Sequence, residues 1–401
     1  MIEKIIFSVL AIGLFTITFL KLVKKNDGSY LYMLSAEFIG IVLSFIELSL
    51  ENKFPFIIKL LIYMFSIILP IIILWLEKYK KLNFPEVFNV TIAKILQHLG
   101  KEEKAKRVIT NFLNKNKNSY ISHKLLAQIH EKQENYEAAI SEYTIVTELN
   151  RNDIESKYNL SFALNKNKQN EEAIIVLQEV LKQKPQNEKA SNLLGDILFE
   201  EERYKEAISV YMTALRYHPA SYDLYYNLGM TYTMINDFKR AKEFYEKAAE
   251  INSMAYNAKL NLGQIALIYG DLEQAEKYFM NSLKSEDLEA GSYYYLSQIA
   301  LLKGDKDKAR NYMNVAVELD PKVYKQAQKD PVFEPIREEI EPPKEKQEET
   351  VIKKKNLTKK EKEVNKHLMK TCILVKNLSN EDIQIIKNNK ETQIKEDRQK
   401  E

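Results

Sequence analysis

The residues able to carry out chemistry are few and scattered in this chain of 401 residues. The five histidines are His98, His123, His130, His218 and His367, and none lies in an H-E-x-x-H motif. P-loop, G-x-S-x-G and C-x-x-C motifs are also absent. The single thiol, Cys372, has no second cysteine with which to form a disulfide or a Cys-rich zinc site, and it fits a reducing compartment. The sequence therefore predicts no catalytic residue, no metal site, no cofactor and no enzyme activity.

Adjacent carboxylates and the overall charge also indicate no catalytic or nucleic-acid-binding site. The pairs Glu171–Glu172 and Glu201–Glu202 fall near expected helix starts, where negative charge favours the helix dipole without needing an acid–base role. The formal net charge of +3 is small, and no Arg-rich patch with interleaved aromatic residues is present. These features argue against a nucleic-acid partner, and nothing indicates a small-molecule substrate.

One carboxylate lies in an unusual place, because Glu37 interrupts an otherwise apolar run. A carboxylate inside a membrane span is costly and often functional. A role in binding a proton or a ligand is one interpretation, and an ordinary hydrogen bond between helices is the other. Both remain open at this point.

Glu37 belongs to one of three apolar runs near the start of the chain, and each approaches the ~20 residues needed to cross a bilayer. We expect residues 1–81 to form a membrane anchor with spans at 5–23, 30–50 and 54–76. A cleaved signal peptide would require a small-x-small cleavage site after the first run, and none is present. An anchor with two spans and the middle run on the membrane surface is the alternative.

The lysines predict the orientation of this anchor. Lys21, Lys24 and Lys25 follow the first run, and a second group follows the third run at positions 78, 80 and 81. Loops rich in Lys and Arg stay in the cytoplasm, so three spans put the N-terminus outside and the rest of the chain inside. The expected location is the cell membrane, and the Lys-, Asn- and Ile-rich composition favours a bacterial source.

Beyond the anchor the sequence repeats itself every 34 residues without insertions. The clearest markers are alanines at positions 105, 139, 173, 207, 241, 275 and 309. A bulky residue follows each alanine by four positions, and a small residue such as Gly195 or Gly229 precedes it by twelve. Apolar residues spaced by three and four predict two helices in each unit, with small residues where the helices approach closely. One such hairpin cannot bury its apolar face alone, so successive hairpins must stack.

The repeat resembles the tetratricopeptide-repeat family, whose pattern is W-x2-L-G-x2-Y followed by A-x3-F and P. The pattern is best met at Tyr225, Leu228, Gly229, Tyr232, Ala241 and Tyr245. The resemblance implies an all-α superhelix of seven repeats over residues 86–323. The unit boundaries are 86–119, 120–153, 154–187, 188–221, 222–255, 256–289 and 290–323. We expect a closing helix at 324–340 and a charged, largely disordered tail at 341–401.

The resemblance also implies a concave groove lined by fixed positions of the first helix in each repeat. The residues expected there are Lys124, Gln128, Tyr158, Asn159, Phe162, Lys189, Asn192, Tyr226, Met230, Met234, Leu260, Ile268, Tyr294 and Leu302. The later positions are aromatic or apolar, which suits a peptide or an amphipathic helix of a partner protein. In the alternative, the segment near Phe333 and Ile336 covers this later part.

Some family members use a clamp of Lys, Asn and Arg side chains to hold a partner's C-terminal carboxylate. The corresponding residues here are Lys124, Gln128, Asn159, Lys189 and Leu193, so the arginine is missing. The leading hypothesis is a membrane-anchored scaffold that binds other proteins at the cytoplasmic face. The alternative is a membrane sensor, or a transport or envelope-assembly accessory, in which the spans are the active element and the repeats the output.

Overall fold

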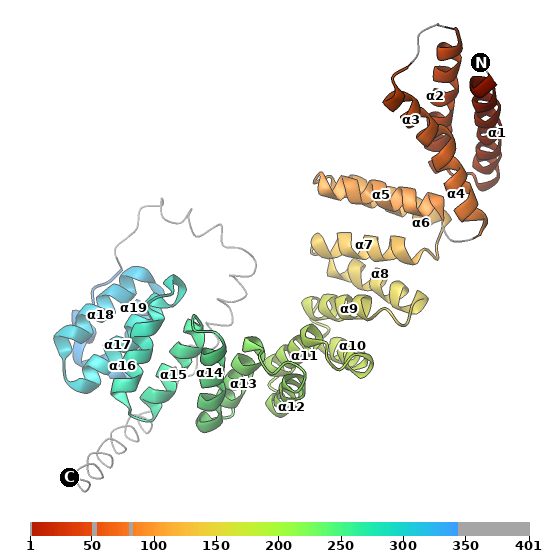
Figure 1. Ribbon diagram of the computed structural model, residues 1–401. Helices are drawn as coiled ribbons and strands as arrows, with labels where there is room; N and C mark the ends of the chain where they lie inside the picture. The colour runs from red at the N-terminus through yellow and green to blue at the C-terminus, as the bar shows by residue number, and fades with distance from the viewer. Residues whose placement is uncertain (1, 50–53, 80–82, 344–401) are drawn as a thin grey trace. The chain divides into compact units, whose positions relative to one another are not determined.

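A computed structural model describes residues 2–49, 54–79 and 83–343 (Figure 1). The chain forms two compact units, Met1–Val176 and Leu177–Glu401. The elements of the described residues are all helical, and helical hairpins follow one another along both units. The predicted all-α fold class is therefore confirmed. Residues 344–401, which include nearly all of the tail expected to be disordered, lie outside the described part of the chain.

The first unit begins with three antiparallel helical segments, which we call the N-terminal bundle. They are α1 (Ile2–Lys25), α2 (Ser29–Ser49) and a third segment made of α3 (Phe56–Tyr63), the π-helical η1 (Met64–Ile68) and α4 (Leu69–Lys78). The π-helical turn lies directly before Pro70, whose ring has no N–H and clashes with the carbonyl four residues earlier. The helix accommodates Pro70 by widening the turn before it.

Small residues let the helices of the bundle pack closely. A Cβ added to Gly40 of α2 would lie 1.7 Å from the Ser66 hydroxyl of η1, and Ala11 of α1 is fully buried. Membrane helices associate in this way, because lipid supplies no hydrophobic force between them. Two helical stretches, Ile5–Lys25 and Phe56–Lys78, are long and apolar enough to cross a bilayer, whereas the described apolar part of α2, Ser29–Leu43, is shorter.

Seven helical hairpins follow the bundle. Their helices are α5 (Phe84–His98) and α6 (Glu102–Lys115), α7 (Tyr120–Lys132) and α8 (Tyr136–Leu149), α9 (Ile154–Lys166) and α10 (Asn170–Gln183), α11 (Glu188–Glu200) and α12 (Tyr204–Leu215), α13 (Tyr222–Met234) and α14 (Phe238–Ile251), α15 (Tyr256–Ile268) and α16 (Leu272–Ser282), and α17 (Glu289–Lys303) and α18 (Lys306–Leu319). Helix α10 contains the boundary between the two units. We number the repeats 1 to 7 in this order.

The turn inside each hairpin contains one residue in the left-handed conformation. Glycine fills this position in three repeats, at Gly100, Gly270 and Gly304, as expected for helix ends. The other four repeats place Glu134, Lys168, Glu202 and Asn236 there, with φ between 60° and 67°. The following residue is the N-cap of the second helix. In three repeats it is Asp237, Asp271 or Asp305, and each of these side chains accepts a backbone hydrogen bond there.

Small residues also bring the two helices of a hairpin together. In repeat 4 a Cβ added to Gly195 of α11 would lie 2.2 Å from the Tyr211 ring of α12, so only glycine fits. The Tyr211 ring is buried against α11 and fills the space that the glycine leaves. The close approach predicted from the spacing of small residues is confirmed at this position.

The last repeat is closed by two short helices, α19 (Lys322–Ala327) and the 3-10 helix η3 (Pro331–Glu339). Phe333 and Ile336 of η3 are buried in one cluster with residues of α15 to α18. Asp330 caps η3 by accepting a hydrogen bond from the Val332 amide. The C-terminal end of the array therefore has its own apolar cover.

Candidate functional site

The groove positions of the first unit lie on α7 and α9. Gln128, Tyr158, Asn159 and Phe162 are all partly accessible. The ammonium of Lys124 lies 3.2 Å from Asp153 and 2.8 Å from Glu155. Burial opposes its charge, but these bonds outweigh that effect and raise the pKa of Lys124. Lys124 is thus already paired with two carboxylates of its own chain, which disfavours a role in a carboxylate clamp.

The groove positions of the second unit differ in accessibility. Lys189 is exposed, and Asn192, Tyr226, Met234, Ile268 and Leu302 are at least partly accessible. Met230, Leu260 and Tyr294, in contrast, are only 3–4% exposed. These three side chains pack inside the chain and offer a partner almost no surface. The apolar character predicted for the later groove is thus largely used for internal packing.

The C-terminal segment covers one groove position of repeat 7, Tyr294. The Tyr294 hydroxyl donates to the Asp330 carboxylate at 2.5 Å, and the Gln298 amide donates to the same oxygen at 2.9 Å. The ring of Phe333 lies against Tyr294, with centroids 5.1 Å apart. The chain's own carboxylate and aromatic ring therefore occupy this end of the groove, as in the covered alternative.

Polar residues of repeats 4 and 5 form a hydrogen-bonded cluster around Asp196. Asp196 lies one turn after Asn192 on the same face of α11. Its Oδ1 accepts hydrogen bonds from the Tyr211 hydroxyl at 2.6 Å and from the Asn227 amide at 3.2 Å. The Oδ1 of Asn192 is buried, with no hydrogen-bond partner among the residues that the structure describes. We call Asn192, Asp196, Tyr226 and Asn227 the polar groove.

The carboxyl group of Asp196 is poised to titrate near neutral pH. Burial raises its pKa to about 6, against the stabilising bond from Tyr211. The negative charges of Glu200 and Asp223 raise it further. The polar groove is consequently acidic above that pH, and it presents hydrogen-bond acceptors. Such a surface suits an amide or an ammonium group of a partner.

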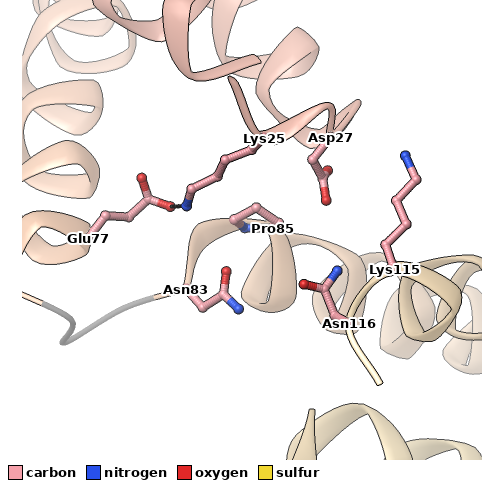
Figure 2. Close-up of a pocket in the computed structure, with 7 residues that line it drawn as sticks. All are labelled: Lys25, Asp27, Glu77, Asn83, Pro85, Lys115 and Asn116. Atoms are coloured by element: carbon pink, nitrogen blue, oxygen red, sulfur yellow. Dashed lines mark hydrogen bonds and ion pairs between the residues drawn. The ribbon is translucent and has the colours of Figure 1, made fainter. Parts of the chain in front are cut away.

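A pocket of about 450 Å³ lies in the first unit, where the bundle meets repeat 1 (Figure 2). It is lined by Lys25, Asp27, Glu77, Asn83, Pro85, Lys115 and Asn116. Lys115 donates to the Asn26 carbonyl at 2.8 Å, and Lys25 is paired with Glu77 at 3.2 Å. The charges at this pocket are therefore engaged in joining the bundle to the repeat, which is a structural role.

Glu77 is the centre of that joint. Its carboxylate accepts from Lys21 of α1 at 2.5 Å, from the Tyr30 hydroxyl of α2 at 2.6 Å and from the Phe84 amide of α5 at 3.3 Å. Its side chain is only 3% exposed. Asn89 of α5 adds a bond to the Ser29 hydroxyl at 2.9 Å. Helices from the bundle and from repeat 1 thus meet at one buried group, and the sequence pattern gave no signal for it.

Within the bundle, the Glu37 carboxylate accepts a hydrogen bond from another helix. The Thr18 hydroxyl of α1 donates to its Oε1 at 2.9 Å, and the side chain is fully buried. Its Oε2 has no hydrogen-bond partner among the described residues. A bond between helices, one of the two interpretations of Glu37, is therefore present.

The histidines of the described residues do not come together, and no group of side chains there could hold a metal ion. His123, for example, contacts Glu142 at 2.5 Å and the Lys117 carbonyl at 2.8 Å, which is a structural arrangement.

Sequence profiles and solved structures show which proteins this chain resembles. Tetratricopeptide-repeat profiles match residues 195–236, 222–254 and 260–323, and the profile of the C-terminal ARM domain of tetratricopeptide repeat protein 21 matches 86–192. The sequence matches no curated protein.

Three solved structures illustrate the similarity of fold. The C-terminal part of a TPR repeat-containing protein from Cytophaga hutchinsonii is 18% identical, with a TM-score of 0.51, and the match covers 58% of this chain and 95% of that one. The MamA protein is 23% identical (TM-score 0.40; 43% and 94% covered). YrrB, described as a TPR protein with an unusual peptide-binding site, is 21% identical (TM-score 0.39; 46% and 93% covered). With its hairpins of 34 residues and these profile matches, the chain belongs to the tetratricopeptide-repeat family.

Proposed function

We propose that this protein is a membrane-anchored scaffold that binds partner proteins at the cytoplasmic face of the membrane through its polar groove. Tetratricopeptide repeats are protein-binding modules, which supports the general role. The anchor is supported by the two long apolar helices, whose outer side chains, such as Phe56 and Ile57, are exposed. If α2 crosses the membrane between them, the lysines that follow both helices lie on the same side, which favours the cytoplasmic side for the repeats.

The observation that carries the choice of surface is the acceptor of Asn192. A buried carbonyl oxygen without a hydrogen bond costs about 1–3 kcal/mol, so a rotation that turns the partly accessible Asn192 side chain toward a partner's donor would recover part of that free energy. The Asp196 carboxylate, one turn along α11, gives the same partner a charge, and Tyr226, at the position equivalent to Asn192 on α13 of the next repeat, offers an apolar contact. An extended peptide or the N-terminal turn of an amphipathic helix has donors of this kind.

The test is crosslinking in intact membranes, followed by recovery of the protein with its partners. Asn192→Ala removes an acceptor that has no hydrogen bond within the described part of the chain, so folding should be preserved while recovery of a groove partner falls about tenfold. Tyr226→Ala should act in the same direction. Tyr217→Ala, at an exposed tyrosine after α12, is the control and should recover partners like the wild type. Unchanged partner recovery for both groove variants would reject this surface.

A second candidate function is favoured by Glu37. A fully buried carboxylate with one unbonded oxygen is the kind of group that binds a proton or a cation within a helical bundle. In this alternative the bundle is a sensor or transport accessory, and the repeats are its output. Glu37→Gln together with exchange of the bundle for an unrelated anchor separates the two proposals. Retained cellular function in both variants excludes the sensor.

A further inference from the structure

The first helix of repeat 1 has an apolar face that no part of the described chain covers fully. Phe84, Phe88 and Ile95 lie on one side of α5, and the C-cap Leu99 continues that side, because their spacing of four, seven and four residues matches the helical period. Thr91 lies on the same side, and its hydroxyl donates to the Val87 carbonyl. Ile95 is 50% exposed and Leu99 is 59% exposed, and Val87 beside this face is 43% exposed.

The same position is buried in every later repeat. Ile95 is the tenth residue of its unit, and its counterparts are at most 2% exposed. These counterparts are Ile129, Ala163, Ile197, Thr231, Ile265 and Ile299. Later repeats thus hide this position in the stack, whereas repeat 1 has no repeat before it. Terminal repeats of such arrays normally have a polar outer face, so an apolar one requires another cover.

The N-terminal bundle covers only the beginning of this face. The Phe84 ring lies 5.5 Å from that of Tyr30, and the Phe88 ring lies 4.7 Å from that of Tyr32. Helix α5 runs across the direction of α2, and its C-terminal end, which contains Ile95, extends beyond the bundle (Figure 1).

The end of the bundle that α5 crosses has the features of a membrane surface. Helix α4 ends at Lys78, and α5 begins six residues later at Phe84. The exposed rings of Trp75 and Tyr79 lie 5.2 Å apart at this end, where aromatic residues gather in membrane proteins. Lys94, beside Ile95, is exposed and suits anionic headgroups.

We propose that α5 is an in-plane membrane helix, whose Ile95 and Leu99 side chains insert among the lipids at the cytoplasmic surface beside the bundle. The inference rests on the membrane anchor of the proposed function, and it adds a lipid-binding face to the repeat array. The bilayer replaces the missing preceding repeat as the cover of this face. An amphipathic helix bound in this way buries its apolar side at the boundary of headgroups and acyl chains.

Fluorescence quenching by brominated lipids tests the proposal with the full chain in bilayers that contain anionic lipid. The sequence has one tryptophan, Trp75, so the wild type reports on the anchor alone. Ile95→Trp in a Trp75→Phe background reports on α5. Met254→Trp in the same background is the control, because Met254 is 70% exposed and lies in the second unit. We expect the indole at position 95 to be quenched within twofold of the wild type, and at least threefold more than the indole at position 254.

The possible results separate the two proposals. If the wild type is quenched but position 95 is quenched no more than position 254, the anchor stands and the in-plane helix is refuted. If position 95 is shielded from both the lipid bromines and aqueous iodide, a second protein copy covers this face, and the lipid proposal is again refuted. If the wild type itself is not quenched, the membrane anchor fails and the inference fails with it.

Discussion

Replacing Asp196 with asparagine should stabilise the protein, and more so at alkaline than at acidic pH. The carboxyl group has a pKa of about 6 in the folded chain and an ordinary value of 3.8. The folded state therefore binds the proton more tightly than the unfolded state does. Stability is greatest where the group is protonated in both states, and it falls as pH rises from about 4 to above 6.

The size of the effect follows from the two pKa values. The charged carboxylate costs the folded state about 3 kcal/mol at pH 8 and roughly half as much at pH 5. Asparagine removes this cost at both pH values and keeps an oxygen that accepts the Tyr211 hydroxyl bond. The weaker neutral bond offsets about 1 kcal/mol of the gain. The net stabilisation should be about 2 kcal/mol at pH 8 and below about 1 kcal/mol at pH 5.

Thermal unfolding of the full chain, followed by circular dichroism in bilayer nanodiscs, measures this difference. For a domain of this size, 2 kcal/mol corresponds to a rise in Tm of roughly 4–8 °C. Comparison of Asp196→Asn with wild type at each pH cancels the titration of the other groups. Asp287→Asn, at an exposed carboxylate, is the control for loss of charge. An equal effect of Asp196→Asn at both pH values, or destabilisation at pH 8, would refute the reasoning.

Three further predictions concern the turns, the hairpin packing and the joint. Glu202→Gly should raise the free energy of unfolding by about 1 kcal/mol, because Glu202 has a φ of 60°, a conformation that glycine adopts without strain. The same change at Glu201, the C-cap of α11, should lower the free energy of unfolding, and urea titration measures both effects. Gly195→Ala should destabilise the protein by about 3 kcal/mol, because the new Cβ meets the Tyr211 ring. Gly291→Ala is the control and should not destabilise it, because no atom lies within 4 Å of the added Cβ. An equal loss of Tm in the two variants would contradict this explanation. Glu77→Gln should weaken the joint between the bundle and repeat 1 by about 2 kcal/mol. Hydrogen exchange at the start of α5, measured by mass spectrometry, should then be more than tenfold faster. Unchanged exchange there would show that Glu77 does not hold α5.

The sequence predicts the hairpins because every repeat contains the same small set of local signals. Alanine and glycine spacing reports the close approach of two helices, as Gly195 and Tyr211 illustrate. The left-handed turn position was visible only where glycine fills it. At Glu134 and Glu202 the surrounding helices impose that conformation on residues that do not favour it, so their types carry no signal.

The groove and the joint were harder to predict, for a different physical reason. Fixed repeat positions indicate which residues point toward the concave side, but not how far neighbouring repeats close over them. Met230 and Leu260 are buried for that reason. Glu77 collects donors from residues as distant in sequence as Lys21 and Phe84, and no local pattern links such positions. The assignment of the groove residues to partner binding stays a prediction.

The joint at Glu77 has a mechanical consequence. A flexible linker would let repeat 1 rotate freely relative to the bundle, so that the array would have no fixed orientation at its start. Hydrogen bonds from α1, α2 and α5 to one carboxylate resist such rotation, because any swivel would break several bonds at a buried group. Repeat 1 therefore turns and tilts together with the bundle. The direction in which the array leaves the bundle is thus fixed at its first repeat, whereas a flexibly tethered module must repeat an orientational search at each encounter.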